Sequence, residues 1–128
     1  ESVVAALPNN TEFIGAKPAT LEQLKLVHSA DHINDVKNEG IFDIASLAVG
    51  GAIQSARIGL NEPCFGLIRP PGHHASAKNA WGFCYFNNMA VSLLTLKSEQ
   101  LIKTAFVLDI DLHYIFELSQ QLTEYHLG

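Results

Sequence analysis

The sequence carries too little positive charge for a nucleic-acid binder. Only 8 of its 128 residues are Lys or Arg, against 13 Asp and Glu, and the basic residues are scattered along the chain. A surface that binds a phosphate backbone needs clustered Lys and Arg side chains. We therefore expect no direct contact with nucleic acid.

Cysteines and long apolar runs are also scarce. The two cysteines, Cys64 and Cys84, are too few for a disulfide framework, and both lie in apolar segments, so we expect buried thiols in a reducing compartment. No apolar run approaches the roughly 20 residues that a membrane helix requires. The first residues do not form a basic-then-apolar signal segment either. These absences predict a cytoplasmic protein with no membrane partner.

What the chain does contain is the composition of a globular domain. Hydrophobic residues make up 48% and charged residues 16% of the sequence, which is the opposite of the balance that keeps a chain disordered. A chain of this length is also long enough to bury a core.

Apolar periodicity predicts two long helices. The first covers Asp43 to Ile58, and the second covers Asn87 to Leu96. Gly50 and Gly51 lie inside the first helix, where each costs about 1 kcal/mol relative to Ala. We expect close approach of a sheet at this point, which small residues allow.

Two short helices are expected upstream of the long ones, after a helix at Glu1 to Leu7. Thr20 and Gln23 have the spacing of a capping box, in which each side chain hydrogen-bonds the other residue's backbone. A further helix begins at Ser29 or Asp31 and ends at Gly40.

Three apolar segments have strand character, namely residues 11–16, 64–68 and 104–110. The last is continuously apolar, as in strands that are buried on both faces. Strands that alternate with helices predict an α/β fold with a parallel sheet.

The third predicted strand ends in the pattern Asp109-x-Asp111-x-His113. A period of two places these side chains on one side of a strand. Asp111 and His113 would have Cα atoms about 6.6 Å apart, a span that one metal ion bridges. We predict these two residues as ligands of Zn²⁺, with Fe²⁺ or Mn²⁺ as alternatives. Asp109 would accept a hydrogen bond behind them or serve another ion. The competing interpretation is a set of polar residues that caps a buried strand.

A histidine pair, His73-His74, follows a rigid Pro-Pro-Gly turn. Such a pair can supply a general base and a general acid for hydrolysis, although two surface histidines are the alternative. Four aromatic residues follow within residues 81–86, and Gly82 among them would let a substrate pass close to the backbone. Core packing is the alternative, which we prefer for Trp81, Tyr85 and Phe86.

Taken together, these motifs resemble the zinc-dependent histone deacetylase and acetylpolyamine amidohydrolase family. The resemblance is carried by Arg-Pro-Pro-Gly-His-His-Ala at 69–75, Gly-Phe-Cys at 82–84, Asn-Asn at 87–88 and Val-Leu-Asp-Ile-Asp-Leu-His at 107–113, and it covers most of residues 1–113. It implies an arginase-like three-layer α/β/α fold with a parallel sheet. It also implies hydrolysis of an N-acetyl amide on a lysine or a polyamine.

The resemblance implies a role for each matched position. His73 and His74 correspond to the general base and the general acid or electrostatic partner. Asp109 corresponds to the residue that orients His73 and contributes to a monovalent-cation site. The remaining matches are Asp111 and His113 as zinc ligands and Gly82 and Phe83 as substrate-channel residues.

The sequence departs from the family after His113. Phe116 stands where the family has the aspartate that orients the second histidine, and the third ligand and the carbonyl-polarising tyrosine are expected beyond Gly128. We therefore interpret residues 1–113 as the N-terminal part of a deacetylase-like domain and 114–128 as a divergent, helical tail. Three hypotheses follow: a deacetylase whose site is completed elsewhere, an inactive metal-binding or oligomerising interaction module, or an α/β domain whose resemblance is coincidental, which the joint motifs disfavour. Because half a domain exposes sheet edges, we expect a homo-oligomer.

Overall fold

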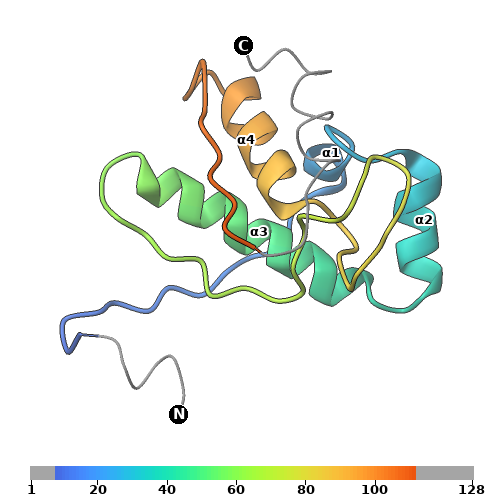
Figure 1. Ribbon diagram of the computed structural model, residues 1–128, viewed down its shortest axis with the longest axis horizontal. Coiled ribbons are helices and arrows are strands. Elements are labelled where there is room, and N and C mark those ends of the chain that lie inside the picture. Colours follow the sequence, from blue (N-terminus) through green and yellow to red (C-terminus); the bar gives the residue numbers. More distant parts are fainter. Residues whose placement is uncertain (1–7, 112–128) are drawn as a thin grey trace.

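The computed structural model describes residues 8–111. Four helices follow one another in this part of the chain (Figure 1): α1 (Leu21–Leu24), α2 (Ala30–Asn38), α3 (Phe42–Gly59) and α4 (Asn88–Ser98). They confirm the four helices predicted in this range. The helix predicted at Glu1 to Leu7 and the tail predicted at 114–128 lie outside the described residues.

Side-chain caps begin three of the helices. Thr20 and Gln23 form the predicted capping box of α1, and the Ser29 hydroxyl accepts the His32 N–H at the start of α2. Asn87 precedes α4 and accepts the Ala90 N–H, so it is the cap of that helix. Each cap satisfies a backbone donor that the first turn of a helix leaves without an intrahelical partner.

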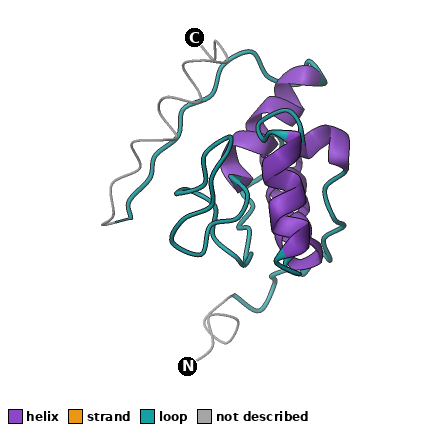
Figure 2. Ribbon diagram, turned by 90° about the vertical axis from the view of Figure 1, so that its right-hand side faces the viewer, coloured by secondary structure: helices purple, strands orange, loops and turns teal. Residues whose placement is uncertain are grey.

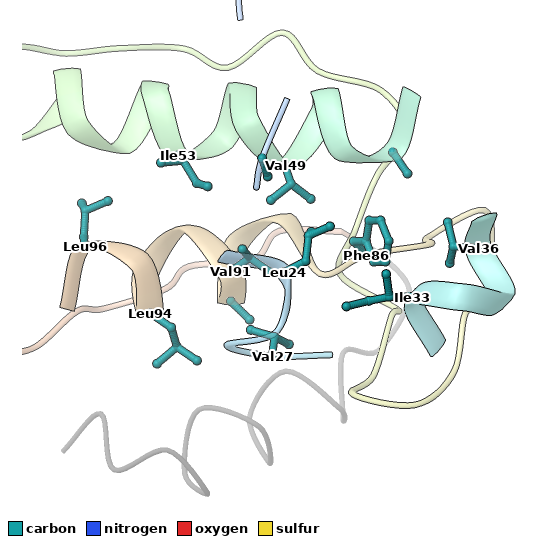
Figure 3. Packing of buried hydrophobic residues seen from close by; sticks show 13 residues of the cluster. Leu24, Val27, Ile33, Val36, Val49, Ile53, Phe86, Val91, Leu94 and Leu96 are labelled. Carbon is teal, nitrogen blue, oxygen red and sulfur yellow. The ribbon is translucent and has the colours of Figure 1, made fainter. Parts of the chain in front are cut away.

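The hydrophobic core lies chiefly between α3 and α4, the most extensively packed pair of helices. Figure 3 shows Val49 and Ile53 of α3 facing Val91 of α4, with Leu24 between the two helices. Phe86, which is 1% exposed, extends this cluster toward α2. An exposed ion pair between Arg57 and Glu99 joins the far ends of α3 and α4, and its exposure limits its contribution to stability.

The three predicted strands are not formed among the described residues. Residues 11–16, 64–68 and 104–110 carry no regular secondary structure, and an isolated antiparallel bridge between Trp81 and Cys84 is the sole β pairing in the described range. A strand exists only where a neighbouring backbone pairs with it. No backbone hydrogen bond between described residues joins these three segments to one another.

Close approach at Gly50 and Gly51 is confirmed, but no sheet makes it. A Cβ atom added to Gly50 would lie 1.7 Å from the carbonyl oxygen of Lys17, and one added to Gly51 would lie 2.7 Å from Ile68 Cγ2. Irregular segments therefore cross this part of α3, one directly after the first predicted strand and one at the end of the second.

The segment 104–110 is not buried on both faces as predicted. Phe106 and Ile110 are each 89% exposed and Leu108 is 75% exposed, whereas the alternate residues Val107 and Asp109 are largely covered. Figure 2 shows the helices on one side of the molecule and this extended segment on the other. One set of alternate side chains therefore has no covering layer among the described residues. Of the helices in residues 8–111, none is long and apolar enough to cross a membrane.

Candidate functional site

The histidine loop, residues 69–75, is held against the start of α4 by two consecutive asparagines. The Asn88 Nδ2 donates to the carbonyl oxygen of Pro70 at 3.0 Å, and the Asn87 Nδ2 donates to that of Ala75 at 3.0 Å. Between these contacts Gly72 lies so close to α4 that an added Cβ would be 2.5 Å from Asn88 N. The glycine of the Pro-Pro-Gly turn therefore allows the loop to cross the first turn of the helix.

The same loop brings His73 to the aspartate with which it was predicted to pair. His73 Nδ1 lies 3.1 Å from Asp109 Oδ2, and both side chains are about four-fifths buried. An ionised carboxylate only accepts hydrogen bonds, so Nδ1 of His73 carries the donated proton. The second oxygen, Asp109 Oδ1, accepts the Asp111 N–H at 2.8 Å. Both carboxylate oxygens of Asp109 are therefore engaged, which fixes its orientation toward His73.

His74 lies beside His73 but meets a different set of residues. The two imidazole rings have centroids 4.0 Å apart, and the ring of Trp81 packs edge-on against His74 at 4.7 Å. A Cβ added to Gly82 would lie 2.7 Å from His74 Cδ2. Glycine at position 82 therefore leaves room for the second histidine.

A tight turn connects Trp81 and Cys84, which hydrogen-bond each other's backbone in both directions. Its two central residues, Gly82 and Phe83, have φ angles of +56° and +63°, as in the primed turns that suit hairpins. Phenylalanine rarely adopts this conformation. Phe83 is also 83% exposed, so a strained backbone presents an aromatic ring to solvent in the turn that contacts His74 through Trp81 and Gly82. Strain of this kind occurs preferentially at functional sites.

An open groove of about 850 Å³ lies beside the histidine loop. It runs between α3, the start of α4 and the segment 107–111, and His73, Asp109 and Asp111 lie along it. Three predicted site residues therefore line one concave surface that is otherwise mostly apolar. Such surfaces with a few convergent polar groups are typical of ligand sites.

The predicted metal site is only partly described. Asp111 is exposed at the end of the described chain, whereas His113 lies outside the described residues. Within residues 8–111, no cluster of three or more His, Cys, Asp or Glu side chains has the spacing to hold a metal ion. The chemistry of the predicted donor pair, one carboxylate and one imidazole, nevertheless suits zinc.

The burial of some residues differs from what the sequence predicted. Cys84 is fully buried, and burial raises the pKa of its thiol, whereas Cys64 is exposed, contrary to prediction. Trp81, assigned to the core, is 66% exposed, although Phe86 is buried as expected.

The sequence did not predict the contact between His28 and Asn87 or the hydrogen bond from Asn87 to the histidine loop. His28 is 3% exposed, and its Nε2 accepts the Asn87 N–H at 2.9 Å. The available signal was the position of Asn87 directly before an apolar helix, where asparagine acts as a cap.

Known proteins are similar to this chain in sequence and in structure. Residues 2–114 match the family model of the histone deacetylase domain. A probable deacetylase of Archaeoglobus fulgidus is 38% identical over 114 residues, which cover 75% of this chain and 32% of that protein. A histone deacetylase-like amidohydrolase of Pseudomonas aeruginosa is 30% identical over 130 residues, which cover 87% of this chain and 34% of that protein.

The structural comparison agrees with the sequence comparison. The crystal structure of the HDA15 HD domain matches with a TM-score of 0.78 at 28% identity, over 85% of this chain and 36% of that chain. The chain thus spans about a third of the length of these relatives. Because the family model extends over most of the sequence, the chain belongs to the histone deacetylase domain family.

Proposed function

We propose that the chain forms the N-terminal part of a metal-dependent amide hydrolase that removes acetyl groups from lysine side chains or polyamines. The observation that carries this proposal is the hydrogen bond between His73 and Asp109. It joins the loop that contains the histidine pair to the segment that contains the predicted ligands, across 36 residues of sequence. Its location on an open, largely apolar groove supports a role in catalysis.

The orientation of His73 suits a general base. With the Nδ1 proton donated to Asp109, Nε2 of the neutral ring has a lone pair that accepts a proton from an attacking water. The negative charge of Asp109 stabilises the imidazolium that forms. His74, whose ring lies 4.0 Å from that of His73, would then donate a proton to the leaving amine or stabilise charge beside it.

The exposed turn at Gly82 and Phe83 suits the predicted substrate channel. Phe83 presents an apolar ring to solvent, one residue after Gly82, which lies against His74 and is itself exposed. An acyl-lysine or acetylpolyamine has a long aliphatic stem, which such a ring would flank. The turn at Gly82 and Phe83 therefore favours a substrate in which an amide is carried on an extended alkyl chain.

Asp111 and His113 would hold the metal, for which we propose zinc, with iron or manganese as alternatives. The bound ion would supply Lewis acidity at the amide carbonyl. Asp109 would also contribute to a monovalent-cation site. We further propose a cytoplasmic location.

For the complete domain we propose three layers, with a parallel sheet between helices. The similarity to the HDA15 HD domain supports this architecture, as does the alternation of exposed and half-buried side chains along 104–110. In this proposal residues 1–113 belong to the deacetylase-like domain, and 114–128 form a separate helical tail.

The proposal is tested by measuring zinc content and acetyl-lysine hydrolysis on one sample. We expect weakly held zinc, because Asp111 and His113 supply two ligands where a catalytic zinc usually has three. Any hydrolysis should fall by roughly 10²–10⁴-fold in His73→Ala, the range that a general base contributes. Lys78→Ala is the matched control, because Lys78 is an exposed side chain in the turn after the histidine pair. Hydrolysis that is unchanged in His73→Ala would refute the proposed role.

A second candidate is a non-catalytic module that binds metal or forms oligomers. The exposed apolar side chains of Phe106, Leu108 and Ile110 favour it, because such residues invite association. A sample with neither bound zinc nor turnover would leave only the interaction role of this candidate.

A further inference from the structure

Two neutral amides bracket the histidine pair and have no role in the hydrolysis proposed above. Asn88 binds the carbonyl of Pro70, three residues before His73, and Asn87 binds that of Ala75, directly after His74. Both contacts are made by side-chain NH₂ groups of residues that are at least 93% buried. The two ends of the histidine loop are thus attached to adjacent residues at one rigid helix end.

Asn87 uses each of its hydrogen-bonding groups for a separate purpose. Its Oδ1 accepts the Ala90 N–H and begins α4, its Nδ2 binds the loop at Ala75, and its backbone N–H donates to His28 Nε2. The cap requires only an acceptor, which aspartate or serine would supply equally well. The contact with Ala75 requires a donor, and this requirement selects asparagine.

Little freedom is left to the loop between these contacts. Gly72 fits against Asn88 N and the carbonyl oxygen of Phe86 with no room for a Cβ atom. The Ser29 N–H also donates to the carbonyl of Ala77 at 2.9 Å, which holds the chain after the histidine pair to the start of α2. The loop is therefore fixed on both sides of the histidines, and their rings follow its position.

We propose that Asn87 and Asn88 are positioning residues, which act through the loop backbone to hold His73 within hydrogen-bond distance of Asp109. This inference rests on the proposed function for one point, namely that the contact between His73 and Asp109 serves catalysis. The hydrogen bonds themselves do not depend on any activity. Its consequence is that removing the side-chain NH₂ group of Asn87 or Asn88 breaks the hydrogen bond between His73 and Asp109.

Asn87→Asp and Asn88→Asp test this with minimal change. Each exchanges a side-chain NH₂ for an oxygen of nearly the same size, so the donor to the loop is lost. The helix should persist, because a carboxylate at the N-terminus of a helix is favourable. The matched control is Asn34→Asp, the same exchange at an exposed position within α2.

The readout is NMR of ¹⁵N-labelled histidine side chains, with the His73 signals assigned by their absence in His73→Ala. In the unmodified chain and in Asn34→Asp we expect His73 to show a hydrogen-bonded Nδ1–H resonance. In Asn87→Asp and Asn88→Asp we expect that resonance to be lost, while circular dichroism shows unchanged helix content.

Retention of the His73 Nδ1–H resonance in both folded variants would overturn the proposal. Should Asn87→Asp unfold, Asn88→Asp decides alone, because residue 88 is not the cap of α4. The measurement needs no turnover. A sample with neither bound zinc nor hydrolysis therefore counts against the proposed function without affecting this result.

Discussion

At the scale of single residues, His28 is a histidine that the fold keeps neutral. Burial is the main cause that lowers its pKa from 6.5 to about 3, and the nearby His32, whose ring centroid is 5.0 Å away, contributes to the same shift. Its Nε2 accepts the Asn87 N–H, so the ring proton lies on Nδ1. That Nδ1 has no hydrogen-bond partner within normal geometry, although the carbonyls of Ser76 and Ala77 lie nearby. Protonation of Nε2 would remove the acceptor for Asn87.

The free energy of unfolding should therefore decrease as the pH is lowered, and part of this decrease should depend on His28. Below pH 6.5 the unfolded chain takes up a proton at this residue and the folded chain does not, so stability is lost as pH falls toward about 3. Denaturant unfolding at neutral pH and at about pH 5 should show a loss of up to about 1.4 kcal/mol per pH unit from this group. In His28→Gln, which retains an acceptor, this part of the slope should disappear. Equal slopes in the two proteins would contradict the assignment.

The contact between His73 and Asp109 was more predictable from the sequence than the contacts that hold the histidine loop in place. The pairing of His73 with Asp109 was expected from family resemblance, and the structure brings the two together. The positions of His28 and Asn87 were not predicted, because the contact between them spans 59 residues and depends on how α2 packs against the loop. Short sequence motifs cannot predict a contact between residues so far apart in the chain.

At the scale of elements, the close crossing over α3 gives a sharp test of packing. In Gly50→Ala the new Cβ meets the backbone carbonyl of Lys17, which cannot rotate away as a side chain would. We expect the free energy of unfolding to fall by about 2–3 kcal/mol. The measurement is chemical denaturation followed by circular dichroism.

The matched control for this variant lies at the end of the same helix. Gly59 has open space around it and a φ angle that other residues adopt. Gly59→Ala should therefore stabilise the chain by up to about 1 kcal/mol, through the lower entropy of the unfolded state. Two glycines of one helix would then respond with opposite sign. A loss in both variants would show that helix propensity and packing have been assigned wrongly.

Helices were predictable here and strands were not, for a physical reason. The hydrogen bonds of a helix close within a few residues, so caps such as Thr20 and Ser29 and the apolar spacing of α3 contain most of the information. The hydrogen bonds of a strand belong to a partner elsewhere in the fold. Residues 104–110 have the composition of a buried strand, yet the described residues provide no partner for their backbone.

At the scale of the whole molecule, the apolar face along 104–110 should control association. Phe106, Leu108 and Ile110 are largely exposed, and contiguous apolar surface of this kind is a site of assembly or aggregation. We predict a homodimer or larger oligomer that buries this face. Sedimentation velocity of a compact, stable monomer would contradict this prediction.

Introducing positive charges on the apolar face tests whether the subunits associate through it. Phe106→Lys combined with Ile110→Lys should shift the chain toward monomer at equal concentration, because lysine cannot be buried there without a partner. Asn34→Lys, at an exposed position on α2, should leave the distribution unchanged. An equal shift in both proteins would indicate a general effect of charge.

The edge-on contact between Trp81 and His74 has an optical consequence. Trp81 is the single tryptophan of the sequence, and its ring lies 4.7 Å from the imidazole of His74. Indole emission is sensitive to the polarity and the proton occupancy of a neighbouring imidazole. The intrinsic fluorescence of the protein therefore originates beside the histidine pair, and events at this pair can be followed by emission with no added label.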